Sequence, residues 1–60
     1  PTVAEDVAFG PLNLRLSHGR VRQLVAETLD RLGLAGFEDR VTYQLSMGER
    51  RLVCLATVLA

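Results

Sequence analysis

The chain has 60 residues, which allows one small domain at most. At this size the free energy gained by burying apolar surface barely offsets the conformational entropy lost on folding. Its seven basic residues, all Arg, equal its seven acidic residues, so the formal net charge is zero. A neutral chain without a basic run lacks the electrostatic features that bind nucleic acid or an anionic membrane surface. One cysteine and one histidine exclude an internal disulfide framework and a zinc-ligand set. No apolar run reaches the ~18 residues of a membrane-spanning helix. We therefore expect a soluble protein with no nucleic-acid partner and no direct membrane insertion.

A first, short helix is expected from Thr2 to Phe9. Thr2 followed three residues later by Glu5 is a capping-box pattern, in which each side chain accepts a hydrogen bond from the other residue's backbone N–H. We expect Gly10-Pro11 to end this helix after Phe9, because this pair interrupts helices. The apolar residues expected on its buried side are Val3, Val7 and Phe9.

A second helix is expected to begin after a linker. The alternating stretch from Leu12 to Leu16 has no visible pairing partner for a strand, so we expect an extended linker with its three leucines packed inward. Ser17 is a favourable N-cap for the helix that follows. Gly33 suits the left-handed position after a helix, with Leu34 placed against Leu29 as in a Schellman motif. The apolar residues of this helix share one face: Val21, Leu24, Val25, Leu29 and Leu32. Residues 35–43 are expected to form a loop.

A third helix is expected from Ser46 to the end of the chain. Residues from Leu52 to Ala60 are apolar on every side apart from the hydroxyl of Thr57, a pattern typical of a buried helix. Cys54 is expected to be a buried, small apolar residue and not a nucleophile. Two other helices cannot cover such a helix, so we expect the chain to be part of a larger folded body. Three helices without a substantial strand predict a mainly α fold.

The most informative motif is the run from Leu45 to Arg51. Ser46 and Glu49 form a second capping-box pattern before an apolar run, and such patterns are common at helix starts. Gly48 is unnecessary for a cap and costs roughly 0.5–1 kcal/mol of helix stability. A glycine there is explained if a ligand must approach the backbone, and a helix N-terminus with free N–H groups and a serine hydroxyl binds phosphate. Capping and phosphate binding both remain open on this pattern alone.

The run from Leu45 to Glu49 resembles the signature motif of ATP-binding-cassette (ABC) ATPases, Leu-Ser-Gly-Gly-Gln or -Glu followed by basic residues. Residues 1–14 are similar to the stretch that follows the Q-loop in cobalt-type and energy-coupling-factor ABC ATPases, and residues 53–60 resemble the helix that leads into their Walker B strand. The resemblance covers essentially the whole chain in order. It implies that residues 1–60 are a partial nucleotide-binding domain: the three-helix subdomain between Q-loop and Walker B of an α/β P-loop ATPase, with the signature at residues 45–49.

The resemblance also implies a function. In this family two subunits enclose two ATP molecules, and the signature of one closes over the γ-phosphate held by the other. By position, Ser46 would donate its hydroxyl and Gly48 its backbone N–H to that phosphate, with Met47 and Glu49 completing the ATP-binding segment. Mg²⁺ would be held by the Walker motifs. The implied partners are a second ATPase subunit and a transmembrane coupling protein that docks near residues 2–9. The parent would import a metal ion or vitamin and lie in the cytoplasm, peripheral to the inner face of the cell membrane.

Departures from the family pattern limit what the chain can do alone. Met47 stands where the family has its first glycine, Glu49 is a common variant of glutamine, and Leu52 stands where the family usually has arginine. The sequence contains no Walker A loop and no Walker B Asp-Glu pair, so these 60 residues alone cannot hydrolyse ATP. His18 is expected to be solvent-exposed or weakly packed. Two alternatives to an ATPase segment are a stand-alone helical protein-interaction module and a non-functional remnant.

Overall fold

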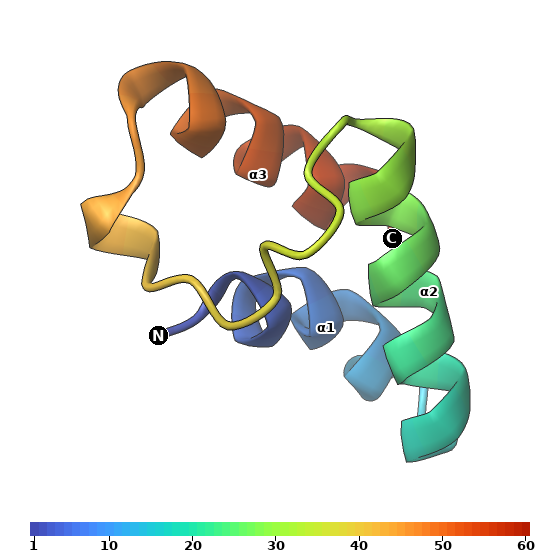
Figure 1. Ribbon diagram of the computed structural model, residues 1–60. Helices are drawn as coiled ribbons and strands as arrows, with labels where there is room; N and C mark the ends of the chain where they lie inside the picture. Colours follow the sequence, from blue (N-terminus) through green and yellow to red (C-terminus); the bar gives the residue numbers. More distant parts are fainter.

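The computed structural model describes all 60 residues and contains three α-helices and one short 3₁₀ turn (Figure 1). The elements are α1 (Val3–Asn13), α2 (His18–Arg31), η1 (Thr42–Gln44) and α3 (Met47–Leu59). No strand is formed; an isolated antiparallel bridge pairs Thr2 with Val41. The predicted mainly α, three-helix fold is therefore confirmed. None of the three helices combines the length and the apolar character that crossing a membrane requires.

Helix α1 begins as the sequence predicts but ends later. The Thr2 hydroxyl accepts from the Glu5 N–H at 3.2 Å, and the Glu5 carboxylate accepts from the Thr2 N–H at 2.8 Å. The expected stop after Phe9 is wrong, because α1 continues through Gly10 and Pro11 to Asn13. Glycine before proline lacks the Cβ that would clash with the proline ring, so the helical conformation is open to it. Pro11 is fully buried and lies close to the helix end, where one missing N–H removes a single hydrogen bond.

The residues around the end of α1 correct two further expectations. Phe9 is not on the buried side, since its side chain is 68% exposed. The inward-packed linker from Leu12 to Leu16 is also wrong, because Leu12 lies in α1 and all three leucines are exposed, Leu14 at 74%. Leu12 is turned around the axis of the extended helix, whereas Leu14 is the C-cap and Leu16 lies in the connection to α2, so the alternating pattern does not direct the three leucines to one face.

Helix α2 matches its prediction at both ends. The Ser17 hydroxyl caps it by accepting from the Arg20 N–H at 3.2 Å. Gly33 has a φ of 74°, and its N–H donates to the Asp30 carbonyl while the Leu34 N–H donates to the Leu29 carbonyl at 2.8 Å. These two bonds form the predicted Schellman motif.

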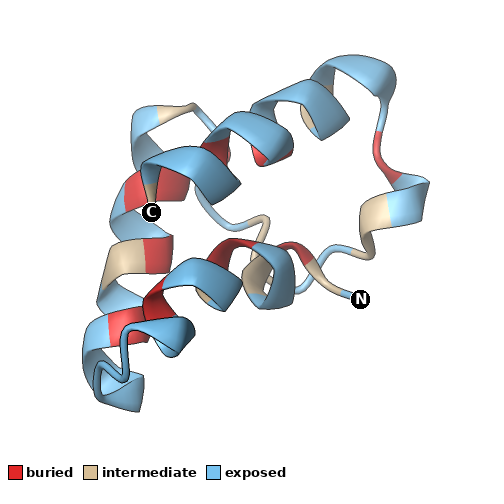
Figure 2. Cartoon of the chain, turned by 180° about the vertical axis from the view of Figure 1, so that it is seen from behind, coloured by how far each residue is buried: buried red, intermediate tan, exposed pale blue.

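The core lies where the three helices face one another, and Figure 2 shows its buried positions on their inner sides. It contains nine apolar residues: Val3, Val7, Val21, Val25, Leu29, Leu34, Leu45, Val53 and Ala56. The loop before η1 is fixed to the start of α1, because the N–H groups of Val3 and Ala4 donate to the carbonyls of Arg40 and Glu38, each at 2.9 Å.

Helix α3 is covered on one side only. Val53 and Ala56 are its buried residues, whereas Leu55 is 46% and Val58 79% exposed. This agrees with the expectation that two other helices cannot cover it. The expected burial of Cys54 is wrong, since this residue is exposed. The reason is geometric: a helix packed along one stripe leaves the rest of its circumference exposed, whatever its composition.

Candidate functional site

The residues singled out as a phosphate site lie together in the first turn of α3. Ser46 is the N-cap: its hydroxyl accepts from the Glu49 N–H at 3.1 Å, and the Glu49 carboxylate accepts from the Ser46 N–H at 2.9 Å. The predicted capping box is therefore present. A serine hydroxyl has one hydrogen to donate in addition to the bonds that it accepts. The Ser46 hydroxyl donates no hydrogen bond within the chain, so its hydrogen is available to a ligand.

Two backbone donors stand beside this hydroxyl. The N–H groups of Met47 and Gly48 have no acceptor in the chain, as is usual for the first residues of a helix. By contrast, the equivalent N–H groups of α1, those of Val3 and Ala4, are bonded to loop carbonyls. The start of α3 thus presents two N–H donors and one O–H donor to solvent at the positive end of a helix dipole.

Packing does not explain Gly48. A Cβ atom added there would meet nothing within 4 Å, and the residue has no positive φ that would favour glycine. Gly19, the second residue of α2, also has open space around it and also follows a serine N-cap. Free N-terminal donors therefore occur on both helices, and the geometry alone does not single out α3. What distinguishes the start of α3 from the start of α2 is its sequence, because residues 45–49 resemble the ABC signature motif.

The residues that flank the Ser46–Glu49 segment fix its position. Leu45, directly before the N-cap, is 8% exposed and belongs to the core, whereas Met47 is 71% exposed. One guanidinium nitrogen of Arg50 donates to the Tyr43 carbonyl at 2.7 Å. Arg51 reaches the sulfur of Met47 at 3.8 Å. The arrangement can bind an anion, and no group of three His, Cys, Asp or Glu side chains is placed to hold a metal ion.

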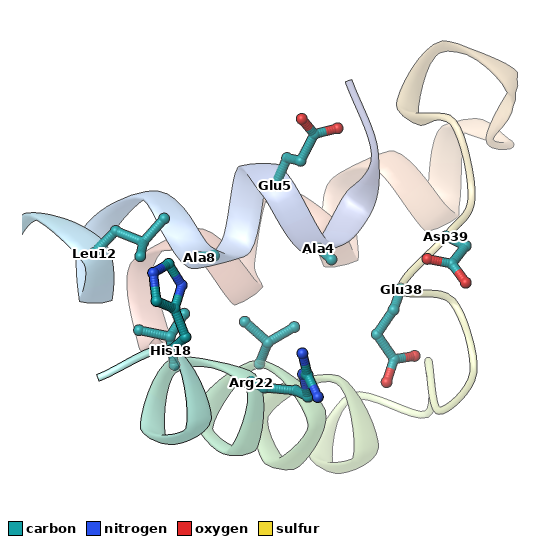
Figure 3. A pocket seen from close by; sticks show the side chains of 10 residues that line it. Ala4, Glu5, Ala8, Leu12, His18, Arg22, Glu38 and Asp39 are labelled. Atoms are coloured by element: carbon teal, nitrogen blue, oxygen red, sulfur yellow. The ribbon is translucent and has the colours of Figure 1, made fainter. Parts of the chain in front are cut away.

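A second feature is a cleft of about 490 Å³ between α1, α2 and the loop around residue 38. Figure 3 shows His18 on α2 at one end of the cleft, Glu38 and Asp39 on the loop at the other end, and Arg22 of α2 between them. Its apolar lining comes from Ala4, Ala8, Leu12, Val21 and Val25. His18 is exposed, as the sequence predicts. The cleft does not follow from the sequence pattern, because its acidic end comes from a loop more than 30 residues after the start of α1. The pair Glu38-Asp39 was the available signal.

Glu5 also lines this cleft, and its ionisation is biased by the capping box. The backbone N–H of Thr2 donates to the carboxylate, and this bond, together with a weaker contribution from the Thr2 side chain, holds the pKa of Glu5 below its ordinary value of 4.5. The carboxylate is fully exposed, so the charged form is favoured by hydrogen bonding and not by burial.

Curated proteins with a similar sequence are ATP-binding proteins of ABC transporters. Over its whole length, the chain is 58% identical to a putative ABC transporter ATP-binding protein of Nitratidesulfovibrio vulgaris, of which it covers 22%. The chain is similar to ABC transporter ATP-binding proteins. It is also 50% identical to the energy-coupling factor transporter ATP-binding protein EcfA of Methanothermobacter thermautotrophicus and 52% identical to EcfA2 of Methanospirillum hungatei, in each case over all of its residues.

The chain spans only about a fifth of the length of these relatives, covering 19% of the EcfA protein and 15% of EcfA2. No protein-family model matches it, and no solved structure matches it significantly. The predicted likeness to ABC ATPases, with energy-coupling-factor proteins among them, is confirmed. The position of the chain within an ATPase domain and the roles of Ser46, Met47, Gly48 and Glu49 remain predictions.

Proposed function

We propose that the chain is a segment of the ATP-binding subunit of an ABC-type importer, and that the turn from Ser46 to Glu49 binds the γ-phosphate of ATP held by a second subunit. The observation that carries the proposal is the set of three free donors at the start of α3, in a chain that matches ABC ATP-binding proteins along its whole length. The resemblance of residues 45–49 to the signature motif supports the same assignment.

Each residue has a separate part in this proposal. The Ser46 hydroxyl donates to a phosphate oxygen while it accepts from the Glu49 N–H, and the N–H groups of Met47 and Gly48 donate beside it. Glu49 holds the N-cap through its carboxylate, so its negative charge is turned toward the Ser46 N–H. The helix dipole adds about 0.3–1 kcal/mol, and up to ~2 kcal/mol in a partly buried site. These groups bind and orient the phosphate.

The remaining chemistry is assigned to segments that these 60 residues do not contain. Phosphoryl transfer needs a phosphate-binding loop, Mg²⁺ and a group that positions the attacking water. We assign these to the Walker motifs of a complete subunit, which would act in the cytoplasm at the inner face of the membrane. Hydrolysis there would drive import of a metal ion or a vitamin. The exposed Met47 narrows the approach to the donors compared with the glycine that the family has at this position.

The transmembrane coupling protein is assigned to the cleft between α1 and α2. The apolar lining suits one face of a helix, and Glu38 with Asp39 at one end favours a partner that places a basic side chain there. The positive charge of Arg22 on α2 would favour an acidic group on the same partner. The occupant we propose is therefore an amphipathic helix that carries both signs of charge.

Ser46→Arg in the complete subunit tests the phosphate assignment. We expect loss of ATP turnover with unchanged binding of nucleotide to the subunit's own Walker A site, because a guanidinium at the N-cap blocks the donors. Ser17→Arg is the matched control: it removes the N-cap of α2, at the same cost of about 0.5–2 kcal/mol, far from the proposed phosphate. Wild-type turnover in the Ser46 variant would remove this residue from the site.

One observation favours a second candidate function, a helical protein-interaction module without ATPase activity. Helix α3 exposes a row of apolar side chains, with Leu55 at 46%, Val58 at 79% and Leu59 at 52%. Circular dichroism with size-exclusion chromatography on the 60-residue chain tests this alternative. A helical, self-associating species without nucleotide supports the module; an unfolded or aggregated chain contradicts it.

A further inference from the structure

The turn before the candidate phosphate site is attached to α3 by one long side chain. Arg50, the fourth residue of α3, donates from a guanidinium nitrogen to the Tyr43 carbonyl at 2.7 Å. The bond joins residues seven positions apart, on either side of the N-cap. Apart from the capping box at Ser46 and Glu49, it is the side-chain hydrogen bond that links α3 to the segment before it.

The turn is held at its two ends: Thr42 donates to the Pro1 carbonyl from its N–H at 3.1 Å and from its hydroxyl at 3.4 Å, and Leu45 is buried in the core. Between these ends few other contacts restrain it. Helix η1 has no side-chain cap, and Tyr43 itself is 67% exposed. The Leu45 N–H reaches the Thr42 carbonyl only at 3.3 Å. A hollow of about 270 Å³ separates the turn from α3; its lining includes Asp6, Cys54 and Arg50. Packing therefore leaves space at this point, and the Arg50 side chain spans it.

The position of Arg50 needs an explanation of its own. A cation near the start of a helix is disfavoured by the dipole, which is positive at that end. A planar guanidinium also loses rotational freedom when it is held in one geometry. Both costs are offset by a charge-assisted bond to a carbonyl that has no helical partner.

We propose that Arg50 is a positioning residue for the phosphate site. By holding the Tyr43 carbonyl to α3, it sets the direction in which Leu45 and Ser46 enter the helix, and so aligns the Ser46 hydroxyl with the N–H groups of Met47 and Gly48. Arg50 acts through the turn and does not contact the phosphate, since its guanidinium is directed back to Tyr43. The inference rests on the proposed function.

The test compares three variants of the complete ATP-binding subunit: Arg50→Met, Arg50→Lys and Arg51→Met. We expect Arg50→Met to lower kcat for ATP about tenfold, the change that ~1.4 kcal/mol of lost transition-state alignment produces. KM for ATP and the thermal midpoint stay unchanged, because the subunit's own nucleotide site and the core are untouched. Arg50→Lys restores most of the activity by keeping a charged donor. Arg51→Met is the matched control: it removes the same charge one residue away, from a side chain that donates a hydrogen bond to the Met47 sulfur at 3.8 Å.

Three results would overturn the inference. Wild-type kcat in Arg50→Met, in a subunit that Ser46→Arg inactivates, would leave the phosphate site standing and remove Arg50 from it. Equal losses in Arg50→Met and Arg51→Met would point to charge alone and not to the bond with Tyr43. A fall in kcat that follows a fall in thermal midpoint, without rescue by lysine, would make Arg50 a general stability residue. Full activity of Ser46→Arg is the separate result that contradicts the proposed function itself.

Discussion

Replacing Gly48 by alanine separates helix stability from phosphate binding. Gly48 is the second residue of α3, its backbone is helical, and a Cβ there would meet nothing within 4 Å. The substitution therefore has no steric cost in the chain and gains the propensity difference between alanine and glycine, about 0.5–1 kcal/mol. A helical Cβ leans toward the N-terminus, so the new methyl group points to the end that the phosphate must approach. We expect a more stable protein that turns over ATP more slowly.

Gly48→Ala should slow ATP turnover because the added methyl group displaces the phosphate. A misplacement of about 1 Å at a reacting group costs up to about 10²-fold in rate, and a methyl group between donor and phosphate enforces a shift of that order. Gly19 provides the matched control, because it has the same position behind a serine N-cap, at the start of α2, with the same open space. Urea unfolding and steady-state ATP turnover of the complete subunit are measured for both alanine variants. Equal turnover in the two variants would refute the explanation of Gly48.

Two further predictions concern stability. Leu29→Ala should lower the free energy of unfolding by about 2–5 kcal/mol, because the Leu29 side chain is fully buried in the core. Val58→Ala should change it by no more than ~0.5 kcal/mol, because the Val58 side chain is 79% exposed. Urea unfolding measures both, and similar values for the two variants would contradict the described core. Because the pKa of Glu5 is lowered in the folded chain, its carboxylate stabilises the fold in full above pH 4.5, and this contribution is lost as the pH falls through the lower folded pKa. Glu5→Gln should remove this part of the acid dependence in unfolding curves between about pH 2 and pH 6. An unchanged curve would contradict the capping box.

The features that the sequence predicted correctly are local ones. The caps at Thr2, Ser17 and Ser46 and the Schellman motif at Gly33 depend on residues within five positions of one another, so a short pattern contains the whole interaction. The end of α1 was mispredicted because Pro11 is stabilised by burial against the rest of the fold, which the local pattern does not contain.

The candidate site also has local features that the sequence predicted and features set by tertiary packing that it did not. The capping box and the free donors at residues 46–49 follow from a four-residue pattern and were expected. The bond from Arg50 to Tyr43 depends on the path of a turn, and the cleft between α1 and α2 depends on where the loop at Glu38 crosses α1. Both are consequences of tertiary packing. The exposure of Cys54 is another, because it is set by which stripe of α3 the other helices cover.

The central claim is that the start of α3 contacts the γ-phosphate of ATP. Photolabelling of the complete subunit with an ATP analogue that has its reactive group on the γ-phosphate, followed by mass-spectrometric mapping, tests it most directly. We expect adducts on the peptide that contains Ser46, Met47 and Gly48, and their loss in Ser46→Arg. Adducts confined to other peptides, with none on residues 45–50, would contradict it.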